Sequence, residues 1–223
     1  MPARSRSGGN RFQLRRRHDY AFAPDLWTFS VKPISISVLT VCGIEELPDQ
    51  GARKVTHVLS LIDPGWREIE AFKNYGSHHR TTLQFHDIIE PIDGKVMPQP
   101  EHVAQILRFG ADLAASRDSR AEGHLLVHCH MGVSRSTAAM LSLLAQVYPK
   151  ETEDRLFARL RDIRPQAWPN SIMVDYADGL LGRGGRLTAA LRRHYRHQIE
   201  QDPGFVDQMT RLGRHREVEM GEV

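Results

Sequence analysis

Residues 127–137 read Val-His-Cys-His-Met-Gly-Val-Ser-Arg-Ser-Thr, and this stretch joins two kinds of secondary structure. The apolar run that leads into it, residues 125–127, is typical of a buried strand, and a helical pattern of apolar residues begins near Ser134. Between them lies a tight loop with one cysteine, one glycine and one arginine. A strand–loop–helix turn of this kind directs several backbone N–H groups and a helix N-terminus at one point. The stretch therefore predicts an anion site within an α/β fold.

Cys129 stands at the centre of this predicted concavity, directly after the strand. Because N–H donors and a helix N-terminus favour negative charge, we expect its thiol to be held as a thiolate. Arg135, six residues later, can present its planar guanidinium to two oxygens of a phosphate group. The chemistry implied is nucleophilic attack by Cys129 on a phosphoester. We expect the phosphate to be bound by the loop residues His130, Met131, Gly132, Val133, Ser134 and Arg135.

Other readings of these residues were weighed. A lone cysteine at a strand end is more often a small buried hydrophobic residue. The neighbours His128 and His130 suggest a metal site, but alternate residues of a strand point to opposite faces. Zinc would need two more ligands, and the second cysteine, Cys42, is distant in the sequence. We therefore expect no metal site and no cofactor.

The Cys-x5-Arg-Ser spacing with an internal glycine resembles the signature loop of the cysteine-dependent protein tyrosine phosphatases. The Gly-Val-Ser-Arg-Ser ending is most similar to the dual-specificity branch and its bacterial relatives. The resemblance implies that Ser136 helps the thiolate to leave a phosphocysteine intermediate and that His128 orders the loop. Residues 164–170 resemble the Arg-Pro…Pro-Asn segment of the same family, in which the asparagine, here Asn170, borders the active site. The family usually continues with glycine and an aromatic residue, whereas here Ser171 follows.

A thiolate that cleaves a phosphoester needs a carboxylic acid to protonate the leaving oxygen. Asp87 is the preferred candidate, because it closes a strand that we expect to run beside the catalytic strand. Asp93, followed by glycine, reads more naturally as a turn, although its distance in sequence from Cys129 is closer to that of small eukaryotic dual-specificity enzymes. Glu90 is a third candidate.

Strand and helix patterns alternate along the chain and predict a fold of the protein tyrosine phosphatase type. Its mixed or parallel sheet should have about four to five strands, with helices on both faces. The predicted strands are 34–41, 55–62, 81–86 and 125–127. The predicted helices are a short one at 43–47 closed by Pro48, a brief one at 66–72, and longer ones at 100–116, from 134 onward, and at 151–163. Right-handed crossovers would bring the strand ends to one edge of the sheet.

Charge divides the chain into three parts. Residues 1–18 contain six arginines and no acidic residue, so the net charge of +3 for the whole chain leaves −3 for the remainder. We expect residues 1–30 to form a basic mobile arm, 31–181 the phosphatase domain, and 182–223 a helical extension with a polar, mobile tail. A basic arm suggests nucleic acid as a partner, but a solvated arm is the more common case, and we expect no nucleic-acid partner.

Composition sets the remaining limits. A chain of 223 residues, 40% hydrophobic and 26% charged, has room for one full domain, and its two cysteines cannot form a disulfide framework. No apolar stretch approaches the roughly 20 residues that span a bilayer. We therefore expect a cytoplasmic protein without a membrane partner.

The sequence predicts a cysteine-dependent, metal-independent phosphatase that acts on phosphotyrosine and, more weakly, on phosphoserine or phosphothreonine in a shallow cleft. Its partner would be a phosphorylated protein or a small phosphoester. Three alternatives remain: a catalytically silent phosphate-binding module, a phosphatase for a non-protein phosphoester, and a rhodanese-like sulfur transferase. Val133 argues against an inositol phosphate, because phosphatases for such substrates commonly carry lysine inside the loop.

Overall fold

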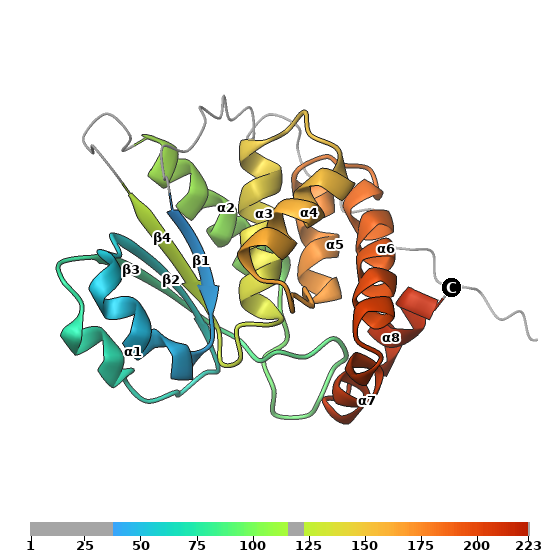
Figure 1. Cartoon of the computed structure of the whole chain (residues 1–223), viewed down its shortest axis with the longest axis horizontal. Helices are drawn as coiled ribbons and strands as arrows, with labels where there is room; N and C mark the ends of the chain where they lie inside the picture. Colours follow the sequence, from blue (N-terminus) through green and yellow to red (C-terminus); the bar gives the residue numbers. More distant parts are fainter. Residues whose placement is uncertain (1–37, 116–122, 223) are drawn as a thin grey trace, which may run out of the picture. The chain divides into compact units, whose positions relative to one another are not determined.

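The computed structural model describes residues 38–115 and 123–222, which centre on a parallel sheet (Figure 1). In this part of the chain the sheet has four strands in the order β1-β4-β2-β3. They are β1 (Val38–Cys42), β2 (His57–Ile62), β3 (His79–Gln84) and β4 (His124–His128). The predicted α/β fold is confirmed, with every pair of strands parallel. The predicted basic arm, residues 1–30, lies outside the described residues.

Both faces of the sheet are covered, which explains why the two central strands are buried along their whole length. One face packs against a group of helices (Figure 1): α2 (Pro100–Ala115), α3 (Arg135–Val147), α4 (Glu153–Ile163), α5 (Ser171–Leu180) and α6 (Arg186–Gln201). The other face carries short elements: η2 (Ile44–Glu46), α1 (Leu47–Gln50), η3 (Gly51–Arg53) and η4 (Glu70–Asn74).

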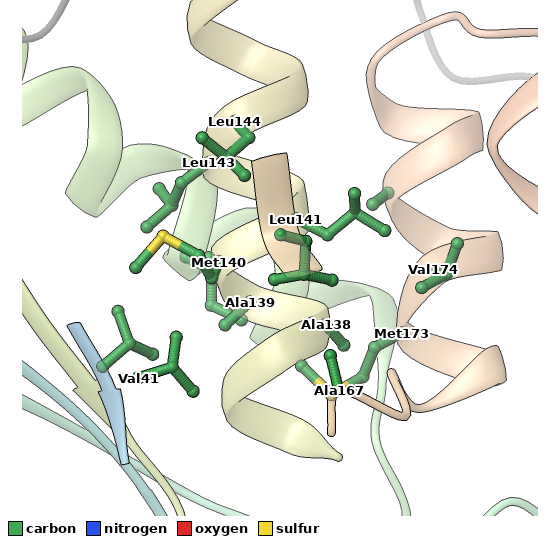
Figure 2. Packing of buried hydrophobic residues seen from close by; sticks show 14 of the residues in the cluster. Val41, Ala138, Ala139, Met140, Leu141, Leu143, Leu144, Ala167, Met173 and Val174 are labelled. Atoms are coloured by element: carbon green, nitrogen blue, oxygen red, sulfur yellow. The ribbon is translucent and has the colours of Figure 1, made fainter. Parts of the chain in front are cut away.

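Helix α3 is the centre of the core, since every residue from Arg135 to Gln146 is buried. A helix that is enclosed on all sides needs small or apolar residues all round, as this one has. Figure 2 shows Met140 and Ala139 directed toward Val41 of the sheet, while the opposite side of the helix meets Met173 and Val174 of α5. This packing fixes the first turn of α3 relative to the strand that precedes it.

Several local predictions need correction. Pro48 does not end a helix; it lies in the first turn of α1, where a missing N–H costs no hydrogen bond. The helix predicted at 66–72 is the 3-10 segment η4. Strand β3 pairs with β2, so it does not run beside the catalytic strand β4, as the choice of Asp87 assumed. Its last residue is Gln84, which places Asp87 in the loop beyond it.

The C-terminal residues belong to the same core. The helix expected after the glycine-rich turn is α6, whose Leu187, Leu191 and Tyr195 are buried in the main cluster. The tail that we expected to be mobile forms α7 (Gly204–Arg211) and α8 (His215–Glu222), which contribute Met209 and Val218 to that cluster. Composition misled here, because a few apolar residues at helical spacing suffice to dock a short helix. No helix within the described ranges is long and apolar enough for a membrane crossing.

Candidate active site

The predicted strand–loop–helix turn is present. Strand β4 ends at His128, α3 begins at Arg135 with Ser134 as its N-cap residue, and residues 129–135, here called the signature loop, connect them. Gly132 adopts a positive φ of 70°. A side chain there would also collide with the backbone, since an added Cβ would lie 2.7 Å from the carbonyl oxygen of Cys42. Glycine is therefore required both for conformation and for space.

The carbonyl oxygens of the signature loop point away from its centre. The carbonyl of His130 accepts from Ile44 N (2.9 Å), that of Val133 from Trp168 N (2.8 Å), and that of Ser134 from Ala138 N (3.0 Å). In a trans peptide unit the N–H points opposite to the carbonyl. The N–H groups of the following residues are thus turned inward, as an anion site requires.

Arg164 holds two further carbonyls of the loop. Its Nε donates to Gly132 O (3.0 Å) and its Nη2 to Met131 O (3.3 Å). The guanidinium is itself fixed by two bonds to Glu46, of 2.8 and 2.9 Å. Arg164 was noted in the sequence only as part of the Arg-Pro segment, and the structure shows that it braces the outer side of the loop.

Cys129 is 1% exposed, and its Sγ lies 3.1 Å from Oγ of Ser136. Cys129, the predicted nucleophile, and Ser136, predicted to help its thiolate leave the phosphocysteine, are therefore in direct contact. The other cysteine differs: burial raises the pKa of Cys42 to about 12, so its thiol stays protonated at neutral pH.

Arg135 is buried and fixed at one end of its guanidinium. Its Nη1 donates to Asp63 Oδ1 at 2.7 Å and to the carbonyl of Phe85. Its Nε is buried without a hydrogen-bond partner. A buried, unsatisfied charged donor is costly, and an anionic oxygen in the adjoining pocket would satisfy it.

A pocket of about 270 Å³ adjoins the loop. The signature loop supplies one side of it, and residues from three other segments supply the rest. Cys129 is not among the lining residues, which agrees with its burial beneath the loop. The lining residues are Asp63, His86, Asp87, Ile88, Lys95, His130, Met131, Val133, Ser134, Arg135, Met209, Leu212 and Arg214.

Asp87 is the predicted acid that the structure brings to this pocket, whereas Asp93 and Glu90 are exposed and lie outside its lining. Its Oδ1 accepts three hydrogen bonds: from Ser134 Oγ (2.8 Å), Asn170 Nδ2 (3.0 Å) and Arg214 Nη1 (2.8 Å). Its other oxygen, Oδ2, lies 4.0 Å from Nε of Arg135. A proton on this carboxyl group would therefore reside on Oδ2, because Oδ1 is occupied by donors.

The charge of Asp87 is set by opposing effects. Burial raises the pKa of Asp87, and the positive charges of Arg214 and Arg135 lower it. The hydrogen bonds from Asn170 and Ser134 act in the same direction, and the pKa of Asp87 lies below its ordinary value. The carboxyl group is thus ionised at neutral pH when the pocket holds no further negative charge.

The two histidines beside Cys129 have separate environments. His128 is fully buried, its Nε2 lies 2.6 Å from Ser60 Oγ, and burial lowers its pKa to about 3. The ring of His130 lies tilted against that of Trp66 with ring centroids 4.1 Å apart, and its Nε2 accepts from the backbone N–H of Asp63 (3.3 Å). Burial, followed by the charge of Arg135, lowers the pKa of His130.

Asn170 lies where the resemblance implied. Its Oδ1 accepts from Met173 N (3.2 Å) and caps α5, while its Nδ2 donates to Asp87. One side chain thus starts a helix and binds the candidate acid, although the glycine and aromatic residue that usually follow in the family are replaced here.

Two charged pocket residues that bind the predicted residues Arg135 and Asp87 were missed in the sequence. Asp63 directly follows β2, and polar residues at the carboxyl ends of parallel strands meet at one edge of the sheet, so a signal for it existed. Arg214 lies in the turn between α7 and α8. No local pattern distinguishes it from the other arginines of that region. In the described part of the chain, no group of three or more metal-binding side chains is arranged to hold a metal ion.

Comparison with known proteins finds a phosphatase of related sequence. The sequence is 32% identical over 130 residues to human protein phosphatase Slingshot homolog 3. The matched region makes up 57% of this chain and 16% of that protein. The predicted resemblance to dual-specificity phosphatases is thereby confirmed, while the bacterial branch stays an expectation. No model of a protein family matches the sequence.

Two solved structures have partial similarity to this chain. The Yvh1 phosphatase domain from Chaetomium thermophilum is 24% identical, with 71% of this chain and 99% of that chain covered and a TM-score of 0.46. Human DUSP28 is 17% identical, with 65% and 92% covered and a TM-score of 0.47.

Proposed function

We propose that this protein is a cysteine-dependent phosphatase that hydrolyses phosphate monoesters through a phosphocysteine intermediate. The observation that carries the proposal is the signature loop, whose five carbonyls from His130 to Ser134 are held on the outside around Cys129. Such a loop presents N–H donors to the three non-bridging oxygens of a phosphoryl group, where charge redistributes in the transition state.

In the first step Sγ of Cys129 attacks phosphorus, and the bond from phosphorus to the ester oxygen breaks. Asp87 gives the proton on Oδ2 to the leaving oxygen, and Arg135 binds phosphoryl oxygens through Nε. In the second step Asp87 takes a proton from water, and the water oxygen attacks phosphorus. The P–S bond breaks while the hydroxyl of Ser136, 3.1 Å from the sulfur, donates to the departing thiolate.

The low pKa of Asp87 has a consequence for pH. A general acid works only while protonated, so activity falls as pH rises through its pKa. A bound phosphoryl group brings negative charge next to Asp87 and raises that pKa, but Arg214 and Arg135 still oppose the rise. We therefore expect an activity optimum on the acidic side of neutrality.

The proposed substrates are phosphotyrosine residues of proteins, with weaker action on phosphoserine and phosphothreonine. Apolar surface at the pocket supports an aryl substrate, since Met131 and Leu212 are each 50% exposed and line it. The free state of Cys42 and Cys129 supports the proposal of a cytoplasmic location. A panel of phosphopeptides tests the preference, and equal rates on all three residue types would contradict it.

The decisive test is Cys129→Ser. This variant should lose turnover of p-nitrophenyl phosphate and still bind vanadate, because the loop donors do not depend on the sulfur. Cys42→Ser is the matched control and should retain activity, since its protonated thiol takes no part. Substantial activity in the Cys129 variant would rule out the mechanism. Vanadate binding by wild type without turnover of any phosphoester would indicate a silent phosphate-binding module.

A further inference from the structure

The C-terminal helices reach the candidate active site through one buried ion-pair network. Arg214, in the turn between α7 and α8, is 4% exposed. Its Nε and Nη2 donate to the two oxygens of Glu217 at 3.0 and 2.8 Å, while its Nη1 points into the pocket. A guanidinium bound at both ends has little freedom to turn.

Glu217 is equally fixed. It is fully buried, and its oxygens accept from Trp168 Nε1 (2.7 Å) and from the backbone N–H of Ser171 (2.7 Å). Both donors flank Asn170, and Trp168 N also holds the carbonyl of Val133 in the signature loop. The network therefore connects α8 to the segment that braces the loop.

At the other end, Nη1 of Arg214 lies 2.8 Å from Oδ1 of Asp87 and 3.0 Å from Oγ of Ser134. Of the three donors on Oδ1, Arg214 is the charged one, and charged hydrogen bonds are about twice as strong as neutral ones. It thus fixes the rotation of the carboxyl group with Oδ2 on the side of Arg135.

We propose that Arg214 is a positioning residue for the general acid, so that the segment from Gly204 to Glu222 is a working part of the active site. The inference rests on the proposed function and extends it. It assigns to the C-terminal segment the task of aiming the proton of Asp87 at the leaving oxygen. Arg214 would exert this effect through its contact with Asp87.

Because charged groups surround Asp87, the loss of Arg214 can be detected as a shift of the pH–rate profile. Arg214 faces it from the α7–α8 turn, Arg135 from α3 and His130 from the loop, while Tyr195 of α6 is buried close by. Glu217 lies behind Arg214. Removing the charge of Arg214 leaves Arg135 as the main cation beside Asp87, so the basic limb of the pH–rate profile must move to higher pH.

The test uses the full chain and Arg214→Gln, measured at the pH optimum of each protein so that positioning and protonation are separated. Turnover of a phosphotyrosine peptide should fall roughly ten- to a hundredfold, the order expected for a misaligned catalytic group. Turnover of p-nitrophenyl phosphate, whose leaving group needs little protonation, should fall at most about threefold. Arg214→Lys should recover part of the loss, because one amine can still bind Asp87.

Arg211→Gln removes the same charge from the exposed end of α7 and should match wild type in both assays. If Arg214→Gln unfolds because Glu217 loses its partner, the double variant with Glu217→Gln removes the unpaired charge. Trp168 and Ser171 donate to different oxygens of Glu217, so the single amide oxygen of glutamine retains one of these two bonds.

Equal losses on both substrates, with the pH profile unmoved, would show that Arg214 is only structural. That result would leave the proposed function intact as long as Cys129→Ser is inactive. Activity in the Cys129 variant would instead overturn the proposed function itself.

Discussion

Gly132→Ala should inactivate the enzyme without unfolding it. The substitution has two separate costs, a positive φ of 70° and a Cβ placed 2.7 Å from the carbonyl oxygen of Cys42. The first costs about 1–2 kcal/mol for a residue other than glycine. The second cannot be absorbed by a side chain, because the neighbouring atoms are backbone.

The size of the effect follows from the distance. Ordinary contact begins at 3.4 Å, so the loop or the end of β1 must move by roughly 1 Å. A misplacement of about 1 Å in a catalytic array costs on the order of 10²-fold in rate. We expect that loss in kcat for p-nitrophenyl phosphate, together with weaker vanadate binding.

Gly182→Ala is the matched control. Gly182 has a φ of 63°, but an added Cβ meets nothing within 4 Å, so this variant bears the conformational cost alone. Both variants should lose thermal stability, measured by circular dichroism, with the larger loss in Gly132→Ala because of the added clash, and only Gly132→Ala should lose activity. Near-normal turnover in Gly132→Ala would refute the argument that the inward N–H groups depend on close contact between the loop and β1.

Three other outcomes are expected. Asp87→Ala should reduce turnover of a phosphotyrosine peptide by roughly 10²–10⁴-fold and of an activated aryl phosphate by less; a larger loss in Asp93→Ala would transfer the role of acid. Ser136→Ala should slow breakdown of the phosphocysteine, seen as a burst of p-nitrophenol before a slow steady state, and a steady state as fast as that of wild type would contradict the contact with Cys129. Burial lowers the pKa of His128 and His194 to about 3, so below pH 6.5 the unfolded chain binds protons that the folded protein does not. The free energy of unfolding should thus fall with pH by roughly 1.4 kcal/mol per unit for each histidine, and urea unfolding that is unchanged between pH 7.5 and 5 would contradict this.

The sequence predicted the part of the site that depends on local backbone. The strand, the loop and the first turn of α3 follow from consecutive residues, and so does the contact between Cys129 and Ser136, because both belong to the same turn. The choice of Asp87 over Asp93 agrees with the pocket lining, but its reasoning was wrong, since β2 lies between β3 and β4.

Contacts between distant segments could not be predicted in the same way. The pairs Arg164–Glu46 and Arg214–Asp87 join residues far apart in the chain, and many arginines are available to make them. Which one does so is decided by how the helices dock. The sequence also did not predict that the C-terminal segment folds into docked helices. Glu217 is buried there because it binds Trp168 and Ser171, which belong to a distant segment.

Because residues outside the signature loop hold its carbonyls, the loop alone cannot be transferred to another protein as a working site. The residues that hold them come from the turn after β1, from Arg164 and from Trp168, not from the loop itself. Grafted into another α/β scaffold, residues 127–137 would carry the cysteine, the arginine and Thr137, whose hydroxyl bonds to the carbonyls of Val133 and Ser134. The partners of the His130, Met131 and Gly132 carbonyls would be missing. A functional transplant would have to include Glu46, Arg164 and the backbone at Ile44 and Trp168, so the smallest transferable unit is a set of separated segments and not a continuous peptide.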